Sequence, residues 1–267
     1  MTFSLAYYNA LLANLRAANR VPARVVDALD ATVASGASLC ILRHDVDRLP
    51  WRAVAMAQLE AGHGIRATYY FRCSVEGRFP EAAIRAISAQ GHEVGYHYET
   101  LSQHAGDRVQ ALAAFERNLE SFRRIAPCET VSMHGAPLSR HNNQDLLVGI
   151  DLARFGLRGD AVLDLARIRP IYITDTGGSW NAGGRRNIRD IGGELVPAVP
   201  DLADPHSAVP FLKAFARPLY ISSHPERWPR TLAGRIQSRL SDALVNAAKH
   251  SLLNVRAALA RSGQAGI

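Results

Sequence analysis

The sequence predicts an α/β fold, a single barrel-like domain in which parallel strands alternate with helices. The chain has 267 residues, a length at which an α/β barrel folds as one unit. Between residues 38 and 125, a strand-like segment is followed by a helical one three times in succession, the pattern of a parallel sheet with right-handed crossovers. Hydrophobic residues make up 48% and charged residues 21% of the chain. This composition excludes disorder, collagen and coiled coil as descriptions of the whole chain.

The first half of the chain predicts two helices and then the three β–α pairs. Apolar residues recur at helical spacing over 4–15, and we expect a second helix over 22–33. The strand-like segments are SLCIL, ATYYF and EVGYHY, at 38–42, 67–71 and 93–98. The helices that follow them cover 52–61, 80–90 and 107–125. Pro80 suits the first turn of the second of these helices.

The second half of the chain has a less regular pattern. Four further strand-like segments lie at 130–134, 160–164, 170–175 and 218–224. We expect a helix at 143–154, a long loop at 177–187 and one long terminal helix after residue 230. Because no repeat, low-complexity tract or clear linker interrupts the series, we expect one domain over 1–267. Its core would lie at about 37–228, with helical additions at 1–35 and 229–262.

Charge and cysteine content bear on partners and compartment. The net charge is +7, but the arginines are scattered, without a dense basic run or a zinc-finger spacing. We therefore expect no nucleic-acid partner, since an anionic small-molecule substrate explains the excess charge as well. No run approaches the roughly 18–20 apolar residues of a transmembrane segment. The 3 cysteines are widely spaced and the first basic residue is Arg16, which predicts reduced thiols and a cytoplasmic protein without a signal peptide.

Side chains that can bind a metal stand at or just after the carboxyl ends of five predicted strands. They are Asp45 and Asp47, His97 and Glu99, His134, Asp175, and His224. In a parallel α/β barrel the active site is assembled at that face from several strands. One such histidine would usually be structural, whereas five strand ends together favour a functional site.

Alternation along the strands sharpens this prediction. Residues two apart in an extended segment share a face, so Asp45 and Asp47 point together, as do His97 and Glu99. Carboxylates brought together need an opposing charge, a shared proton or a metal. A mixed carboxylate and imidazole set suits a divalent metal such as zinc.

Four motifs carry a resemblance to a known family. Along the chain they are RHDVD (43–47), GIRATYYF (64–71), GHEVGYHYE (91–99) and SSHPERW (222–228). Over roughly residues 37–228 the chain resembles the polysaccharide deacetylases, family four of the carbohydrate esterases, and among them a divergent branch with HDVD, YHYE and HPERW motifs. The resemblance implies a distorted (β/α) barrel with about seven strands. It also implies removal of N- or O-acetyl groups from sugars, usually with a divalent metal.

The resemblance assigns roles to individual residues. It implies that Asp45 is the catalytic base, Asp47 a metal ligand, His97 the first histidine of the family's HxxxH metal motif, and His224 the catalytic acid. The two acids are separated by Val46 here, whereas they are adjacent in the family.

The sequence leaves the third metal ligand open. Leu101 stands where the family has its second metal histidine, so Glu99, His104 or His134 would take its place. His134 belongs to SMHGAP, which replaces the family's Arg-x-Pro-x-Gly motif. The shared strand face favours Glu99, whereas the preference of zinc for imidazole favours a histidine.

A glycine-rich loop and the terminal helix carry weaker signals. In GGSWNAGGRRN (177–187), Trp180 would offer an indole face to a sugar, and Arg185 and Arg186 would offer guanidinium groups to a phosphate or carboxylate. With Asp175 they form the predicted substrate-binding set, although a mobile surface loop is an equal interpretation. The terminal helix would pack on its own barrel, on another subunit or on a membrane surface.

The first functional hypothesis is a cytoplasmic, metal-assisted hydrolase that removes an acetyl group from the nitrogen of a carbohydrate. Zinc is the expected ion, and the substrate would be a small molecule or an oligosaccharide, including nucleotide- or lipid-linked sugars. Asp45 would take a proton from water and His224 would protonate the departing amine. Loss of either residue is expected to leave stability unharmed.

Three alternatives stay open. The same fold would also serve a hydrolase of non-sugar carbon–nitrogen bonds, with or without a metal. An inactive sugar-binding relative is a second possibility. In a purely structural interpretation, the acids form buried salt bridges with Arg43 or Arg72. The sequence does not define the oligomeric state.

Overall fold

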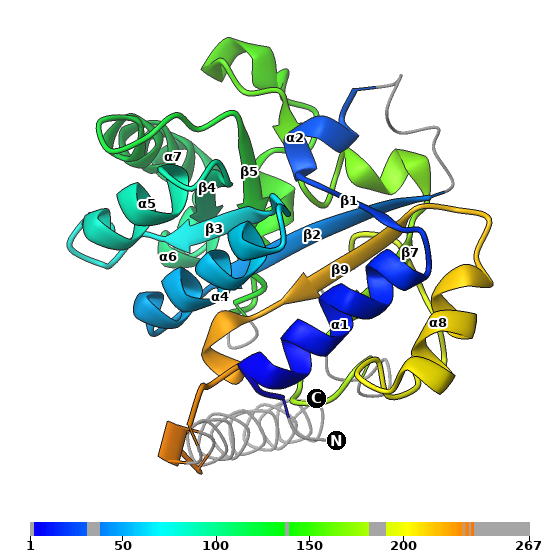
Figure 1. Cartoon of the computed structure of the whole chain (residues 1–267). Helices are drawn as coiled ribbons and strands as arrows, with labels where there is room; N and C mark the ends of the chain where they lie inside the picture. The colour runs from blue at the N-terminus through cyan, green and yellow to red at the C-terminus, as the bar shows by residue number, and fades with distance from the viewer. Residues whose placement is uncertain are drawn as a thin grey trace, which may run out of the picture.

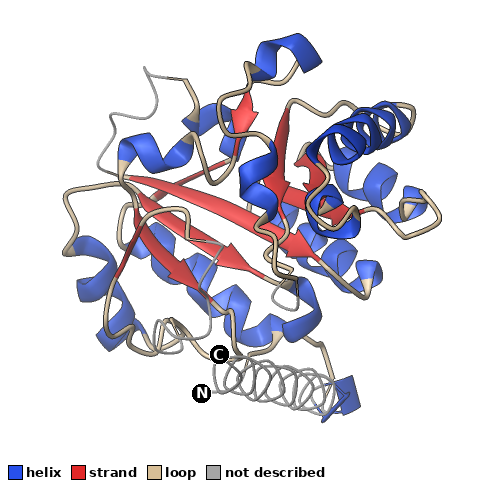
Figure 2. Ribbon diagram, turned by 180° about the vertical axis from the view of Figure 1, so that it is seen from behind, coloured by secondary structure: helices blue, strands red, loops and turns tan. Residues whose placement is uncertain are grey.

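The computed structural model describes residues 3–30, 38–136, 139–181, 191–231, 233–234 and 236–237. Within them, parallel strands form one curled sheet with helices on its outer side (Figures 1 and 2). This is a distorted (β/α) barrel, and the predicted fold class is confirmed. The strands are β1 (Val21–Ala23), β2 (Leu39–Val46), β3 (Thr68–Arg72), β4 (Glu93–Tyr98), β5 (Thr130–Met133), β6 (Gly159–Asp160), β7 (Ile171–Thr174), β8 (Glu194–Leu195) and β9 (Leu219–Ser223).

The order of the strands places β2 near the middle of the sheet. From β2 the chain builds β3, β4, β5 and β6 in succession on one side, while β9, β7 and β8 lie on the other and β1 pairs with β2 off this path. The described pairs are all parallel. Among the described residues the outermost strands, β6 and β8, do not pair with each other, so the barrel is open there. Because the strands run the same way, their carboxyl ends share one mouth.

Helices cover the outer side of the sheet. They are α1 (Leu5–Ala17), α2 (Val25–Ala28), α4 (Pro50–Gly62), α5 (Glu81–Ser88), α6 (Thr100–Gln103), α7 (Arg108–Arg123) and α8 (Pro205–Lys213), with 3-10 turns η1 (Asn143–Leu146), η2 (Leu152–Phe155), η3 (Leu165–Ile168) and η4 (Pro225–Arg227). Side chains cap three of these helices: Ser4 accepts from the N–H of Tyr7, Asp107 caps α7, and Asp204 caps α8. Figure 1 shows α1 alongside β9.

The sheet separates two apolar cores. Leu39 and Ile41 of β2 face the interior of the barrel and pack there with Tyr70, Tyr172 and Tyr220. Cys40 and Leu42, which alternate with them, pack against the helices. Arg43 and Asp45 continue the interior face toward the carboxyl end of β2. The interior of the barrel therefore changes from apolar to ionic along this one strand.

Several predicted elements differ from the observed ones. The helix expected over 22–33 is preceded by strand β1, because the segment with Pro22 pairs along β2 at the edge of the sheet. The helix expected at 143–154 is two 3-10 turns, because Gly149 between them has φ +77°, outside the helical region. The strand near 160–164 is the two-residue β6. Strands β1 and β8 were not predicted, and they bring the sheet to nine strands rather than about seven.

One further difference, and one prediction that the described residues do not test, concern the second half of the chain. Helix α8 was not anticipated, although Asp204 followed by Pro205 is a recognisable helix start. The terminal helix expected within 229–262 lies almost entirely outside the described residues, as do parts of the N-terminal addition at 31–35.

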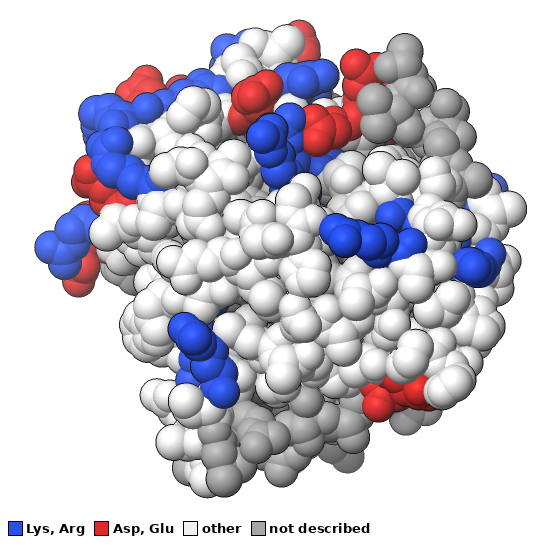
Figure 3. All heavy atoms as spheres, viewed as in Figure 1, with Lys and Arg blue, Asp and Glu red and all other residues white. Residues whose placement is uncertain are grey.

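The surface seen in Figure 3 carries its basic side chains in separate groups, several of them beside acidic ones, rather than as one continuous basic area. This agrees with the scattered arginines of the sequence. In the described part of the chain, no helix is long and apolar enough to cross a bilayer.

Candidate active site

Strand register brings the predicted residues to one height at the mouth of the barrel. Val46 at the end of β2 lies opposite Phe71 of β3, and Arg72 at the end of β3 lies opposite His97 of β4. Asp47, the next residue after β2, therefore comes level with Arg72 and His97. β5 ends beside β4 and delivers the SMHG segment to the same place.

Asp47 faces two imidazole rings. Its Oδ1 is 3.6 Å from Nε2 of His97, and its Oδ2 is 3.7 Å from Nε2 of His134. The other ring nitrogens are held from behind, with Nδ1 of His97 3.0 Å from the carbonyl oxygen of Ser132 and Nδ1 of His134 2.8 Å from Oε2 of Glu99. These contacts orient each ring so that its Nε2 faces Asp47.

The carboxylate of Asp47 has capacity left for a further partner. Burial acts to raise its pKa, but the neighbouring His134 and His97 outweigh burial and hold the pKa below its usual range. Among the described residues, its buried Oδ1 has no hydrogen-bond partner. An ionised carboxylate with an unused acceptor atom, facing two imidazoles, is an arrangement that favours a bound cation.

The donor types fit a divalent metal. Two atoms bound tetrahedrally at about 2.0–2.2 Å from zinc lie roughly 3.3–3.6 Å from each other, close to the 3.6 and 3.7 Å between Asp47 and the imidazoles. The hydrogen bonds at both Nδ1 atoms are those that metal-binding histidines usually make. In the described residues, no three His, Cys, Asp or Glu side chains are yet arranged as a complete metal site.

Glu99 is occupied on both oxygens. Arg72 donates to its Oε1 from Nε at 3.0 Å and from Nη2 at 2.6 Å, while Oε2 faces Nδ1 of His134 at 2.8 Å. Burial acts to raise the pKa of Glu99, but His134 and Arg72 outweigh it and lower the pKa to about 2. Glu99 therefore orients His134 instead of offering a free oxygen to the centre of the site.

The structure does not bring His104 to this cluster. Helix α6 begins shortly after β4 and separates His104 from the strand, because His104 follows the last residue of this helix. His104 instead lies near Asp107, the N-cap of α7, and is one of the groups that lower the pKa of that carboxylate. Among the described residues, no hydrogen bond or ion pair joins His104 to Asp47 or His97.

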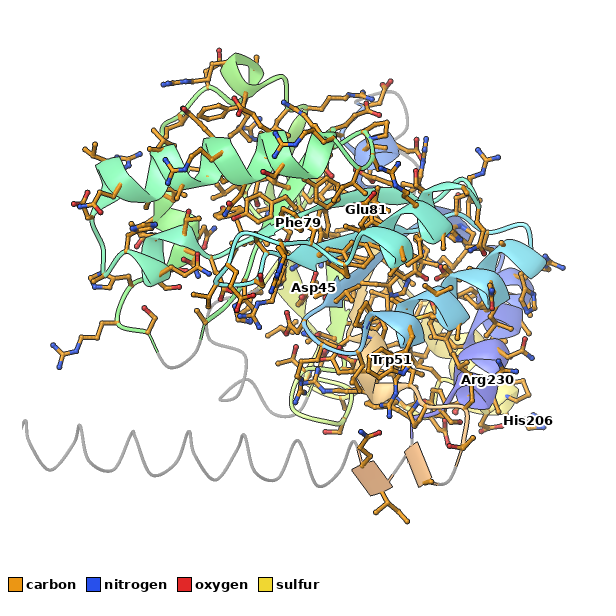
Figure 4. The ribbon with its side chains drawn as sticks, turned by 90° about the vertical axis from the view of Figure 1, so that its left-hand side faces the viewer. Asp45, Trp51, Phe79, Glu81, His206 and Arg230 are labelled. Carbon is orange, nitrogen blue, oxygen red and sulfur yellow. The ribbon has the colours of Figure 1, made fainter. Side chains whose placement is uncertain are left out.

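Asp45 lies deeper in the barrel, in a buried ion pair (Figure 4). Arg43 donates to Oδ1 from Nε at 2.8 Å and to Oδ2 from Nη2 at 2.6 Å, and its Nη1 donates to the hydroxyl of Tyr220 at 3.2 Å. Oδ2 of Asp45 is also 3.9 Å from Nε2 of His97. The salt bridges of the structural interpretation are thus present, both here and between Arg72 and Glu99, and they flank Asp47 without involving it.

This ion pair corrects the expectation that Asp45 is dispensable for stability. Both partners are fully buried, and removing one charge from such a pair leaves the other unpaired, which typically costs about 3–5 kcal/mol. Any substitution of Asp45 therefore mixes a catalytic effect with a structural one.

His224 follows β9 and is held by Asp175. Its Nδ1 is 2.6 Å from Oδ1 of Asp175, and its backbone N–H donates to Oδ2 at 2.9 Å. The indole N–H of Trp228 also donates to Oδ2, at 2.7 Å. Burial and Arg227 act to lower the pKa of His224, but Asp175 and then Asp47 outweigh them and raise it to about 9. His224 is therefore protonated at neutral pH and can donate a proton.

Asp175 and Trp180 do not take the substrate-binding positions predicted for them. Asp175 is fully buried with both oxygens engaged, so it positions His224 and Trp228. Trp180 is buried too, its indole N–H donating to the hydroxyl of Tyr7 at 3.0 Å and its ring packing on Trp228. The loop is not a mobile surface loop at this position. Arg185 and Arg186 lie outside the described residues.

Sequence reasoning missed Glu226. It lies in turn η4 just after His224, buried, with Oε1 3.6 Å from Nη2 of Arg48 and its carbonyl oxygen accepting from Arg52. Burial, and then the charge of Asp47, raise its pKa to about 7. The signal was present in the HPER motif, but an acid next to an arginine in a turn is usually a surface pair.

A second ionic cluster, which we call the outer cluster, lies on the opposite face of β2 and β9. It consists of Glu60, His44, Tyr8, Tyr69 and Ser223. Nε2 of His44 is 2.8 Å from Oε1 of Glu60, and its Nδ1 is 2.7 Å from the hydroxyl of Ser223. The two tyrosine hydroxyls donate to Glu60 at 2.5 and 2.6 Å. All five side chains are buried under α1 and α4.

Comparison with known proteins adds a likeness to a solved structure. No family model matches the sequence, and no curated protein matches it. A solved structure described as a mutant of BA3943, a pseudoenzyme of family four of the carbohydrate esterases with restored enzymatic activity, is similar at 16% identity and a TM-score of 0.36. The match covers 69% of this chain and 65% of that one. A likeness of this size carries no argument about activity, so function is argued from the site itself.

Proposed function

We propose that this chain is a metal-assisted hydrolase that removes an acetyl group from the nitrogen of a sugar or sugar derivative. The observation that carries the proposal is the convergence of two imidazole Nε2 atoms on Asp47 at 3.6 and 3.7 Å, next to a separate His224 that is held by Asp175. The first group suits a cation and the second suits a leaving amine, so the mouth of the barrel offers both halves of a hydrolytic reaction.

Asp47, His97 and His134 would hold the metal, with Glu99 and the carbonyl of Ser132 orienting the two imidazoles. A bound divalent ion such as zinc lowers the pKa of water to near neutrality and stabilises negative charge on a carbonyl oxygen. The set replaces the HxxxH pair of the resembled family with His97 of β4 and His134, which directly follows the adjacent strand β5. Of the three candidates for the third ligand, His134 is supported best.

Asp45 would accept the proton of the attacking water. Its Oδ2 is 3.9 Å from Nε2 of His97, and its pairing with Arg43 fixes the direction of the carboxylate, whose remaining lone pairs would accept the proton. A positioned base of this kind is typically worth 10²–10⁴ in rate.

His224 would supply the proton that the departing nitrogen needs. An amine leaves poorly as an anion, so its expulsion depends on an acid on the opposite side of the carbonyl from the base. Asp175 accepts from the imidazole at 2.6 Å and keeps the ring charged. After the proton is given, Asp175 holds the neutral ring in place for the next cycle.

The test has two measurements on the full chain. The zinc-loaded protein should release acetate from at least one member of a panel of N-acetylated sugars that includes free, oligomeric and nucleotide-linked forms. No acetate from the whole panel would overturn the proposed activity. Metal content should fall from stoichiometric to background in Asp47→Ala, His97→Ala and His134→Ala, while the matched control His104→Ala retains zinc. Zinc retained in His134→Ala and lost in His104→Ala would overturn the ligand set.

A further inference from the structure

A seam in the sheet divides the candidate site into two halves. In the order of the strands, β2 and β9 are neighbours (Figure 1). The base Asp45 and the proposed metal ligands come from β2, β4 and β5 or from the residues that directly follow these strands, whereas His224 follows β9 and its partner Asp175 follows β7. The distance between the proton donor and the rest of the site is therefore set where β2 meets β9.

A polar pair of side chains joins the two strands at this seam. His44 of β2 lies opposite Ser223 of β9, and its Nδ1 is 2.7 Å from the hydroxyl of Ser223. Nε2 of the same ring is 2.8 Å from Oε1 of Glu60 on α4. His44 directly precedes Asp45, and Ser223 directly precedes His224. We call the chain of contacts from Ser223 through His44 to Glu60 the seam bridge.

The surroundings of the seam bridge are apolar, and its three side chains are at most 1% exposed. A buried ionic pair is often no more stabilising than apolar residues of similar volume, and its best-attested use is to fix register. The seam bridge is therefore better explained by the position it gives to the strand ends than by stability alone. The apolar residues of the two strands on this face are Cys40, Leu42 and Val46 of β2 and Leu219 and Ile221 of β9.

Helix α4 contacts both sides of the seam. It begins after Leu49, which turns the chain in a left-handed conformation with φ +53° and ψ +58°. In the first turn of the helix, the guanidinium of Arg52 donates to the carbonyl oxygen of Glu226, in turn η4 just after β9. Near its end, the helix carries Glu60 of the seam bridge. The helix that supports the seam bridge is thus also anchored on the segment that carries the proton donor.

We propose that the seam bridge positions His224 for proton transfer, with Ser223 and His44 as positioning residues. The bridge ties the end of β9 to β2, so that the proton donor stays at a fixed distance from the base. Asp45 has a support of its own, because Arg43 holds both oxygens of its carboxylate. The inference rests on the proposed function, since it takes a departing nitrogen to receive the proton of His224.

The kinetic test compares an amide with an ester on the zinc-loaded full chain. An amine needs a proton to leave, whereas para-nitrophenolate leaves as the anion, so para-nitrophenyl acetate does not depend on the acid. Ser223→Ala should lower kcat roughly tenfold for the N-acetylated sugar of the panel that the parent cleaves fastest, because a small misplacement of a catalytic group is costly. Its kcat for the ester, its KM values and its zinc content should be unchanged.

Tyr69→Phe is the matched control. The hydroxyl of Tyr69 donates to Oε2 of Glu60 at 2.6 Å, whereas His44 faces Oε1. The substitution removes one fully buried hydroxyl, as Ser223→Ala does, but leaves the seam bridge intact. Both variants should lose similar thermal stability, and Tyr69→Phe should keep the parent's kcat on both substrates. If alanine at 223 prevents folding, Ser223→Cys, with its weaker hydrogen-bonding thiol, should reproduce the selective loss on the amide.

Hydrogen exchange gives a readout that does not need turnover. The backbone N–H of His224 donates to Oδ2 of Asp175 at 2.9 Å, and its exchange rate reports local opening at the end of β9. By NMR, this amide should exchange roughly tenfold faster in Ser223→Ala than in Tyr69→Phe. Because the two variants are matched in global stability, a merely structural role would not separate them.

The outcomes distinguish the seam bridge from the hydrolase. Equal losses of kcat on the amide and the ester, or the same amide loss in Tyr69→Phe, would overturn the positioning role and keep the hydrolase. No acetate from the parent with any sugar of the panel would overturn the hydrolase, while faster exchange at His224 in Ser223→Ala would still support the positioning of its imidazole. Equal exchange of this amide in the two variants would overturn the positioning role in either case.

Discussion

The candidate site and the outer cluster are built from alternating residues of the same strands, yet they differ in two physical respects. In the outer cluster, Ser223, His44 and Glu60 follow one another at 2.7 and 2.8 Å, the order of atoms in a catalytic triad. Both oxygens of Glu60 are filled by donors, and the group is closed to solvent. In the candidate site, Asp47 keeps an oxygen without a hydrogen bond and its side chain is 18% exposed. Access and unused bonding capacity, more than residue type, separate a reactive cluster from a structural one.

The sharpest test of this contrast is a pair of amide substitutions. Glu60→Gln replaces one carboxylate oxygen, which accepts from buried donors, by an NH2 group that cannot accept, and we expect a loss of about 3–5 kcal/mol in the free energy of unfolding. Asp47→Asn should change it by less than about 1 kcal/mol, or raise it, because reactive sites give up stability for function. Urea denaturation measures both. Equal losses in the two variants would contradict the distinction.

The next largest effect concerns His224, for which the outer cluster has no counterpart. His224→Gln should lower acetate release by at least about 10², since a positioned acid is lost. With a pKa raised to about 9, the parent's activity should fall as pH rises through 9, because the protonated form is the donor.

The stability of the parent should follow the same group. Because the pKa of His224 is higher in the folded chain than its unfolded value of about 6.5, its contribution to stability is complete below pH 6.5 and is lost as pH rises through 9. The difference between thermal unfolding at pH 7 and at pH 10 should therefore shrink in His224→Gln. An unchanged difference would contradict a contribution of charged His224 to the stability of the folded chain.

Glu99 combines features of both clusters, because it is a fully engaged acid, like Glu60, but it orients His134 in the candidate site. Glu99→Gln should weaken zinc binding roughly 10–100-fold, as expected for a residue that orients a ligand without being one. Activity should return at raised zinc. Glu81→Gln, on the exposed face of α5, is the control. Abolition of binding at any zinc concentration would make Glu99 a ligand.

The smallest effect is expected at Leu49, where the site stores strain that the outer cluster lacks. A leucine in the left-handed region costs about 1–2 kcal/mol, and glycine gives back about 0.5–1 kcal/mol through its flexible unfolded chain. Leu49→Gly should therefore stabilise the protein by about 0.5–1 kcal/mol, measured by thermal unfolding. A clear loss of stability would show that contacts of the leucine side chain outweigh its backbone strain.

The parts of the fold and site that the sequence predicted are those governed by local pattern. Alternation placed Asp45 and Asp47 on the interior face, and the βαβ order placed their strand end beside that of His97. Which partner each group meets was not predictable, because it depends on neighbouring strands. Glu99, for example, was predicted to share a face with His97, but it bonds to His134, the residue after β5.

The burial of Trp180 could not be predicted from the sequence, for the same reason. Its loop has the composition of a surface segment, and the burial of the indole depends on packing with helix α1, where Tyr7 accepts its N–H. Helix α8 was missed although its start signal was present, whereas the two turns at η1 and η2 replaced a predicted helix because a single Gly149 interrupts it.

The packing of α1 against the end of the barrel has a consequence for the order in which the chain folds. Phe3 stacks on Trp228 with ring centroids 4.5 Å apart, although they are more than 200 residues apart along the chain. At about 5–20 residues per second, translation leaves α1 without this partner for roughly 10–40 s. During that interval Phe3 and its apolar neighbours on α1 are open to chaperones and to other nascent chains. Because Trp228 also bonds Asp175, this contact links the N-terminal end of the chain to the carboxylate that holds His224.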